Sequence, residues 1–445
     1  MLFSSIVFLC FFLPAVVLVH AALPQRLRNG FLLLASLVFY AWGDARYLPL
    51  FLLLAVINYA CALGMGRWRR AGGVLCALGV LVNAGALVYY KYAGLLLPFL
   101  TRTPALPLGI SFYVFQSLSY LLDVRAERVK PERSLLRYTT YIMLFPQLIA
   151  GPIVRYSDVS EALRKRPLTP AHMEHGMMLF LIGLGSKVLL ANRLGALFDA
   201  LCAVAERGAL GTASAVIAYG FQIYYDFAGY SLMAMGIGEM LGFAFPRNFH
   251  HPYAAASIRD FWHRWHITLG DWLRTYIYIP LGGSRKGTAR TIVNLLITWG
   301  LSGLWHGAGF NFLAWGLYFG LLLILEKYVW GNWLARHRAV GHVYAFLTVM
   351  ASWVLFAFGS MEEMGAFAAQ LLEPALGENV LFLIACSALP LLLSAVFAVP
   401  RVCGGCAALL EKRPALRCAA LLAVLVLCVM ELLGAQYNPF LYFRF

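Results

Sequence analysis

Charged side chains are scarce in this chain. Only 12% of its 445 residues are Asp, Glu, Lys or Arg and 62% are hydrophobic, whereas a soluble domain carries about 25% charged residues. Apolar runs recur from end to end and leave no polar stretch long enough for a separate soluble domain. The first run, residues 1–19, lacks the basic start of a secretory signal and is expected to remain as a helix. We therefore predict an all-α, polytopic membrane protein.

Acidic residues are the scarcer charge, since 20 Asp and Glu stand against 35 Lys and Arg and give a net charge of +15. A basic balance can indicate nucleic-acid binding when the charge forms one continuous face. Here the basic residues form clusters in short loops between apolar runs, at residues 26–28, 67–70, 125–137, 164–166, 336–338 and 412–417. Such clusters are typical of the cytoplasmic ends of membrane spans, and no nucleic-acid partner is expected.

Three signatures of familiar enzyme classes are missing. The sequence has no Gly-x-Ser-x-Gly elbow for a serine nucleophile. It also lacks a Gly-x-x-x-x-Gly-Lys-Ser/Thr phosphate loop and the His-Glu-x-x-His of a zinc peptidase. Its nine cysteines are odd in number and lie mostly in apolar runs, so they are expected to be small packing residues and not a disulfide framework. Histidine remains the candidate base, because its pKa lies near neutrality and it can accept a hydroxyl proton.

Apolar stretches that recur along the chain are candidate membrane spans. They are Leu2–Val19, Gly30–Trp42, Tyr47–Met65, Gly72–Tyr90, Leu108–Leu122, Leu136–Ile153, Gly176–Phe198, Ala213–Tyr225, Tyr230–Phe243, Thr291–Leu304, Phe310–Leu325, Val343–Gly359, Val380–Val399 and Ala415–Leu433. Several are shorter than the roughly 20 residues that cross a bilayer, so they are expected to be tilted, broken or re-entrant. Shortness and Gly or Pro content are greatest between residues 107 and 310. Because irregular backbone at membrane depth must be buried in protein or line water, we expect a catalytic core at 107–325 between scaffold helices at 1–106 and 326–445.

His306 lies inside an apolar, glycine-rich run, residues 299–311, that otherwise indicates a membrane span. Burying imidazole in a bilayer is costly unless it is paired or lines a wet cavity, so such a residue is a functional candidate by default. The neighbouring glycines would let backbones approach closely, as a substrate tunnel needs. The alternative interpretation is a packing histidine bonded to a neighbouring helix.

The segment at residues 248–286 is less hydrophobic and rich in aromatic residues. Taken as one helix, its central part places His263 and His266 on neighbouring faces and lets Asp260 pair with Arg264 at a spacing of four. Tryptophans interleaved with charges also suit an amphipathic helix at the membrane interface. We regard His306 as the general-base candidate and His266 as its possible polar partner.

A metal site is not expected in this segment. His250, His251, His263 and His266 could supply ligands, but no carboxylate lies at a partner spacing. A closed metal site needs about four ligands in a defined geometry. The sequence therefore indicates neither a metal nor a bound cofactor.

Asp226 is a further charge beside apolar sequence, within residues 222–230. It could orient a histidine or pair with an arginine at membrane depth. It could equally cap the end of a helix at the water boundary. Both interpretations stay open at this point.

Seven blocks of sequence occur in an order shared with a known family. They are Ala35–Gly43, Pro107–Tyr113, Phe145–Tyr156, Gln222–Tyr230, Phe261–Leu269, Tyr278–Gly283 and Leu301–Asn311. With these blocks the chain resembles the membrane-bound O-acyltransferase (MBOAT) family, and within it the bacterial branch of the alginate O-acetyltransferase membrane subunit. The resemblance implies roughly 11–14 transmembrane and re-entrant helices around a central tunnel. It covers nearly the whole chain.

The resemblance also implies a reaction. An enzyme of this kind takes acetyl from cytoplasmic acetyl-CoA, as donor substrate, and moves it across the bacterial inner membrane. A periplasmic partner of the SGNH hydrolase type would then complete O-acetylation of a polysaccharide, alginate or another exopolysaccharide. His306 matches the family's essential histidine and His266 its other polar active-site position. Arg155 is a candidate contact for CoA phosphates because guanidinium pairs well with phosphate, although such arginines more often contact lipid.

Other functions remain open on the sequence. Within the same family the chain could serve peptidoglycan O-acetylation or D-alanyl transfer, which uses a carrier-protein thioester in place of CoA. In a different class it could be a polysaccharide or lipid export channel whose histidine lines a pore. Leu232, Thr275 and His263 depart from the branch's usual residues. These departures concern acceptor or partner contacts and leave both histidines in place.

Overall fold

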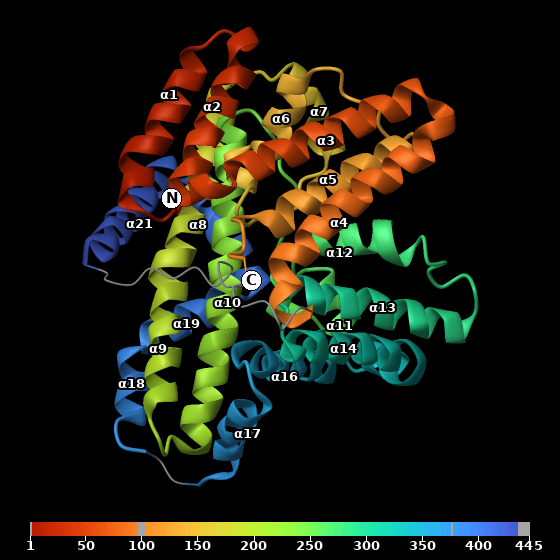
Figure 1. The fold of residues 1–445 in the computed structure, drawn as a ribbon. Helices are drawn as coiled ribbons and strands as arrows, with labels where there is room; N and C mark the ends of the chain where they lie inside the picture. Colours follow the sequence, from red (N-terminus) through yellow and green to blue (C-terminus); the bar gives the residue numbers. More distant parts are fainter. Residues whose placement is uncertain (1, 97–103, 375–376, 435–445) are drawn as a thin grey trace. The chain divides into compact units, whose positions relative to one another are not determined.

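The computed structural model describes residues 2–96, 104–374 and 377–434. Within these ranges the chain is built of helices and has no β-strand, which confirms the all-α prediction. The chain divides into two compact units, whose helices are labelled in Figure 1. The first unit is Met1–Phe180 with Ser231–Arg247, and the second is Leu181–Tyr230 with Asn248–Phe445.

Among the described residues, six helical stretches are long and apolar enough to cross a membrane. They are Gln25–Arg67, Arg69–Leu96, Pro170–Ala203, Phe310–Arg336, Arg338–Ala357 and Pro414–Gly434. A bent pair of helices, Val380–Cys386 and Ala388–Phe397, makes a seventh if it counts as one span. The chain is therefore a multi-pass membrane protein, as its composition predicts.

The first unit contains three neighbouring helices, α3, α4 and α5, which lie side by side in Figure 1. Its helices are α1 (Leu13–Ala22), α2 (Gln25–Asp44), α3 (Leu48–Arg67), α4 (Gly72–Leu96), α5 (Ile110–Arg125), α6 (Leu135–Met143) and α7 (Tyr156–Arg164), with the first part of α8 (Pro170–Gly185) and the last part of α10 (Gly208–Met240). The candidate span Leu136–Ile153 is broken, as expected for spans in this proline-containing region, because the α-helix ends at Met143. Pro146 and Pro152 lie in the irregular stretch that follows, where proline removes backbone donors and obstructs helical turns.

A buried carboxylate, Glu132, ties the chain together between α5 and α7 of this unit. It accepts hydrogen bonds from Arg137 Nη2 at 2.6 Å, from Tyr156 Oη at 2.7 Å and from the backbone N–H of Ser134 at 2.9 Å. Burial alone would raise the pKa of Glu132, but these bonds to its charged form lower the pKa to about 2. Glu132 is therefore ionised throughout the physiological pH range.

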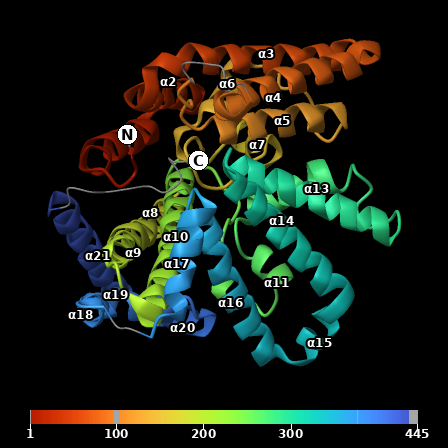
Figure 2. The ribbon, with the colours of Figure 1, turned by 60° about the horizontal axis from the view of Figure 1, so that its bottom comes forward.

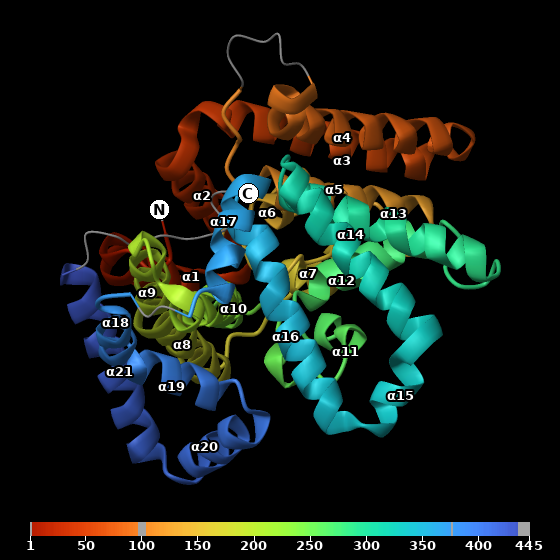
Figure 3. The ribbon, with the colours of Figure 1, turned by 90° about the horizontal axis from the view of Figure 1, so that it is seen from below.

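The second unit holds the remaining helices. They are the last part of α8, α9 (Asn192–Ala203), the first part of α10, α11 (Ile258–Trp262), α12 (Ile267–Leu273), α13 (Thr288–His306), α14 (Phe310–Leu325), α15 (Gly331–Arg336), α16 (Arg338–Ala357), α17 (Met361–Ala369), α18 (Val380–Cys386), α19 (Ala388–Phe397), α20 (Pro400–Lys412) and α21 (Pro414–Gly434). Figure 2 shows α13 and α14 running side by side. In Figure 3 the chain leaves α14, passes through α15 and returns along α16.

Two glycines allow α13 and α14 to pack closely. A Cβ atom at Gly303 would collide with the carbonyl oxygen of Phe312. A Cβ atom at Gly316 would likewise collide with the carbonyl oxygen of Trp299. Small residues at such crossings let helix backbones approach within membranes. This contact fixes the part of α13 that ends in His306.

The helix α10 replaces two of the predicted spans. Two spans, Ala213–Tyr225 and Tyr230–Phe243, were expected, but one continuous helix runs from Gly208 to Met240. The helix continues past Asp226. The Asp226 carboxylate stays buried because it pairs with the ammonium group of Lys187 at 2.7 Å, and both side chains are 3% exposed. A buried charge that is paired does not need to reach water.

Candidate active site

His306 is the last residue of α13 and its side chain is buried, with 2% of the residue exposed. Its Nδ1 lies 2.7 Å from the backbone carbonyl oxygen of Ser302, one helical turn earlier. A carbonyl oxygen can only accept, so Nδ1 carries the proton and donates. In the neutral ring Nε2 then holds the lone pair, which is the state required of a general base.

Aromatic rings surround this imidazole. The centroid of the His306 ring lies 4.9 Å from that of Trp305, 4.8 Å from Trp315 and 5.8 Å from Phe356. All three pairs are edge-on arrangements, which aromatic quadrupoles favour. These rings exclude water from the base and hold its orientation.

His266 lies at a break between two short helices, and not within one helix as the sequence analysis expects. The helix α11 ends at Trp262 and α12 begins at Ile267, with His266 at the N-terminal boundary of α12. The break arises at His266 itself, whose φ of 44° and ψ of 51° are left-handed. Residues other than glycine rarely adopt this conformation, and it persists only where surrounding contacts fix it. The expected pair between Asp260 and Arg264 does form, at 2.7 Å.

Asn248 supplies the contacts that fix His266, and the sequence analysis gave it no role. Its Oδ1 accepts hydrogen bonds from the backbone N–H of Thr268 at 3.3 Å and from Thr268 Oγ1 at 2.8 Å. The same oxygen lies 3.1 Å from His266 Nδ1, and the carbonyl of Asn248 accepts from the N–H of Ile267 at 3.0 Å. Because this side-chain oxygen only accepts, His266 Nδ1 donates. His266 therefore also has its lone pair on Nε2.

Both histidine rings lie near the indole of Trp305. The Trp305 ring lies 5.8 Å from the His266 ring and 4.9 Å from the His306 ring. His266 is 1% exposed, and its Nε2 is buried without a hydrogen-bond partner. It lies outside the helices long enough to span a membrane, and burial, followed by the nearby His306, lowers its pKa. His266 is thus held neutral.

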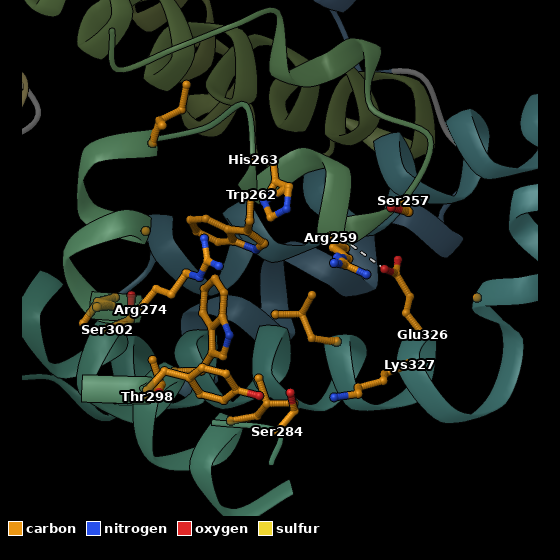
Figure 4. Close-up of a pocket in the computed structure, with 18 of the residues that line it drawn as sticks. Ser257, Arg259, Trp262, His263, Arg274, Ser284, Thr298, Ser302, Glu326 and Lys327 are labelled. Carbon is orange, nitrogen blue, oxygen red and sulfur yellow. Dashed lines mark hydrogen bonds between the residues drawn. The ribbon is translucent and has the colours of Figure 1, made fainter. Parts of the chain in front are cut away.

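A cavity of about 1110 Å³ (Figure 4) is lined by Ser302, one helical turn before His306, and by Ile267, which follows His266, but by neither histidine. Its lining comes from the α11 to α12 segment, from α13, and from the end of α14 through α15 to the start of α16. Ser302, whose carbonyl holds His306, is one of the lining residues, and its buried Oγ has no hydrogen-bond partner. His263 also lines the cavity and is exposed. The cavity therefore ends one helical turn from His306.

The other predicted polar residues, Asp226 and Arg155, have partners of their own. Asp226 lies in mid-helix and pairs with a lysine, so it does not cap the end of a helix. Arg155 belongs to the first unit, where its backbone N–H donates to Asp158 at 2.9 Å. It is not among the residues that line the 1110 Å³ cavity. Its contact with CoA phosphates stays a prediction.

The described ranges contain no cluster of possible metal ligands. Within them, no group of three or more His, Cys, Asp or Glu side chains could hold a metal ion. His250 and His251 have ring centroids 5.7 Å apart, but no third such ligand joins them among the described residues. Polar groups near the histidine pair include the Ser302 hydroxyl and the basic residues that line the cavity.

Comparison with known proteins gives one family and several relatives. The model of the membrane-bound O-acyltransferase family matches residues 7–361. A protein of Pseudomonas fluorescens named a probable alginate O-acetylase is 39% identical over 82% of this chain and 74% of its own length. A peptidoglycan O-acetyltransferase of Helicobacter pylori is 32% identical over 81% of this chain and 78% of its own. A teichoic acid D-alanyltransferase of Bacillus subtilis is 26% identical over 56% of this chain and 66% of its own.

Proposed function

Because the chain belongs to the membrane-bound O-acyltransferase family and is an acyltransferase, we propose that it moves acetyl from acetyl-CoA for O-acetylation of a polysaccharide. Relatives named for alginate O-acetylation are about 40% identical to it over the aligned residues, more than those named for peptidoglycan O-acetylation or D-alanyl transfer. Alginate or a similar exopolysaccharide is accordingly the proposed acceptor. The proposed location is the bacterial inner membrane.

One observation carries this proposal at the level of chemistry. Two buried imidazoles lie around Trp305, and each donates from Nδ1 to an oxygen that can only accept. In each neutral ring the lone pair therefore lies on Nε2, the atom that can accept the proton of an acceptor hydroxyl. His306 has a backbone carbonyl as its support, and its position at the end of a packed helix makes it the better-fixed base. We assign His306 as the base and His266 as its polar partner.

The proposed step transfers acetyl from a thioester to a hydroxyl. His306 Nε2 takes the proton of a hydroxyl as its oxygen attacks the carbonyl carbon of the thioester. The carbon–sulfur bond breaks, and the proton passes from His306 to the leaving thiolate. The products are an acetyl ester and a free thiol. His266 Nε2, buried beside Trp305, can hold a hydrogen bond to the attacking or product hydroxyl.

A separate periplasmic partner belongs to the proposal. The resemblance to the family implies that contact with a polysaccharide outside the membrane falls to another protein. An SGNH-type acetyltransferase, as the resemblance implies, would carry out the last transfer. Acceptor specificity would then reside with the partner and not with the histidine pair.

The test is the O-acetyl content of secreted and envelope polysaccharides, measured by proton NMR. A deletion strain would carry the wild-type chain, His306→Gln or His306→Ala at matched membrane levels. We expect acetyl groups to return only with the wild type while the amount of polymer stays constant. Normal acetylation with either variant would refute the catalytic assignment, and a changed amount of polymer would favour export.

The NMR measurement distinguishes between acceptors, and a transfer assay in membranes distinguishes between donors. Acetyl groups on peptidoglycan in place of exopolysaccharide would assign the function named for the Helicobacter pylori relative. Transfer from labelled acetyl-CoA in purified membranes is expected for an acetyltransferase. Its absence, with activity only on a carrier-protein thioester, would favour the D-alanyl transfer chemistry named for the Bacillus subtilis relative.

A further inference from the structure

A second, smaller cavity adjoins the one that ends near His306. It has a volume of about 350 Å³ and shares Arg274, Tyr278 and Ser284 with the 1110 Å³ cavity. Its remaining lining includes Arg285 and Lys286. The two cavities therefore adjoin at these three residues, and the smaller one has a basic lining.

The loop at this basic lining is fixed by α13. Two consecutive glycines, Gly282 and Gly283, have φ values of 109° and 55°, which L side chains rarely adopt. The buried amide of Asn294 donates from Nδ2 to the carbonyl of Leu281 at 3.3 Å and to that of Gly283 at 2.9 Å. These bonds direct the carbonyl groups of the turn toward α13. The basic side chains that follow, at 285 and 286, are exposed.

The same helix leads from this loop to the histidine. Leu295, Thr298, Trp299 and Ser302 line the large cavity at spacings of three and four, which is one face of an α-helix. The next residue of that face is His306. From Asn294 to His306 the helix rises about 18 Å at 1.5 Å per residue. An elongated ligand lying along this face would place one end at the basic loop and the other near the base.

The charges along the path favour an anion at the loop end. Among the described residues, Arg274, Arg285 and Lys286 take part in no ion pair. Asp271 and Glu326 are the acidic residues that line the large cavity. The carboxylate of Glu326 is already engaged, because it accepts from the backbone N–H groups of Ile258 and Arg259 at 2.5 and 3.0 Å. Figure 4 shows Arg259 and Lys327 beside it. Arginine binds phosphate through charge-assisted, often paired hydrogen bonds.

We propose that Arg274, Arg285 and Lys286 bind the phosphate of a phosphopantetheine thioester whose arm lies along α13 with its acyl end at Ser302. This inference rests on the proposed function and names the residues that hold the donor. Phosphopantetheine occurs both in CoA and on carrier proteins, and its length separates the phosphate from the thioester. The buried, unpartnered Oγ of Ser302 would bond to a polar group at the far end of the arm.

Binding to the full-length protein in lipid nanodiscs tests the proposal. The probes are CoA, 4′-phosphopantetheine and pantetheine, which lacks phosphate. The variants are the double substitution Arg285→Ala with Lys286→Ala, and the control Arg336→Ala, an exposed residue of the same unit that lines neither cavity. We expect the double variant to bind CoA about 10- to 100-fold more weakly, the range for lost charge-assisted bonds. Pantetheine binding and the control should not change.

The probes also identify which phosphate is bound and where it comes from. An equal loss for 4′-phosphopantetheine and CoA assigns the loop to the phosphate next to the arm, and a loss for CoA alone assigns it to the nucleotide phosphates. Competition between CoA and a phosphopantetheine-loaded acyl carrier protein identifies the source. Arg155→Gln in the same assay tests the earlier candidate.

Three results would overturn the proposal. They are a wild-type protein that binds neither CoA nor 4′-phosphopantetheine, a double variant that binds CoA normally, and an equal loss of affinity for pantetheine. The last would indicate a structural effect of the substitutions. None of them bears on the polysaccharide measurement with His306→Ala, so failure of this inference and failure of the proposed function are distinguishable.

Discussion

Replacing Asn248 by aspartate keeps an acceptor beside His266 Nδ1 and adds one negative charge. In the wild type, burial and then the nearby His306 lower the pKa of His266 below its ordinary value. The unfolded chain therefore takes up a proton first as the pH falls below about 6.5. Stability is intact above that pH and decreases below it, by up to about 1.4 kcal/mol per pH unit until the folded pKa is reached. Between pH 6.5 and 5 this amounts to about 2 kcal/mol at most.

The added carboxylate would favour the imidazolium form and raise the pKa of His266 above its wild-type value. Asn248→Asp should then lose less stability than the wild type between pH 6.5 and 5. Its acetyl transfer should lose activity at a higher pH, because protonation removes the lone pair of His266 Nε2. Thermal unfolding in detergent and transfer rates, both followed between pH 5 and 8, measure the two effects.

The control is Thr268→Val, which removes a donor to the same Asn248 oxygen without adding charge. It should lower stability by about 1 kcal/mol at every pH and leave both pH profiles in place. If Asn248→Asp and the wild type gave parallel curves in both assays, the hydrogen bond from His266 to Asn248 would have no influence on protonation. The tautomer assigned to His266 would then be wrong.

Three further substitutions test the packing and polar contacts. Gly303→Ala should lower stability by about 1–3 kcal/mol and reduce transfer, since its Cβ would collide with the backbone of α14, whereas Gly300→Ala meets only side chains at 3.7 Å and should be tolerated; thermal unfolding of both compares them. Glu132→Gln should lower the free energy of unfolding by about 3 kcal/mol, because it removes the negative charge that pairs with Arg137. Glu127→Gln, at an exposed site, is the control. The stability from Glu132 ionisation should be complete above about pH 4.5 and be lost as the pH falls through about 2, which unfolding at acid pH measures. Glu326→Ala should raise protease cleavage in the α11 segment, whose N–H groups lose their acceptor, and an unchanged cleavage pattern would count against that contact.

The sequence identifies His306 and its helix because the signal there is local. A histidine in a long apolar run is unusual on its own, and the predicted span Thr291–Leu304 lies within α13, Thr288–His306. The predicted span Phe310–Leu325 has the bounds of α14. Regular helices of apolar residues are set by neighbours along the chain, and composition alone defines them.

The support of His266 could not be read from the sequence in the same way. Its left-handed backbone follows from contacts with Asn248, 18 residues earlier, and a pattern that reads i to i+4 spacings predicts one helix there. One signal was present: an asparagine in a stretch rich in histidine and aromatics, between two helical segments. The continuity of α10 was missed for a related reason, because Lys187, which neutralises Asp226, lies 39 positions away.

The two histidines differ in what holds their protons, and this difference argues for their roles. The proton of His306 Nδ1 is held by the backbone carbonyl of Ser302, which no side-chain substitution removes. That of His266 depends on the amide of Asn248, which also has to satisfy Thr268. A base that must present the same lone pair in every cycle is better served by the fixed support. Substitution of the Asn248 side chain therefore perturbs the contacts of His266 and Thr268 but leaves the bond from His306 to Ser302 in place, so it tests the partner separately from the base.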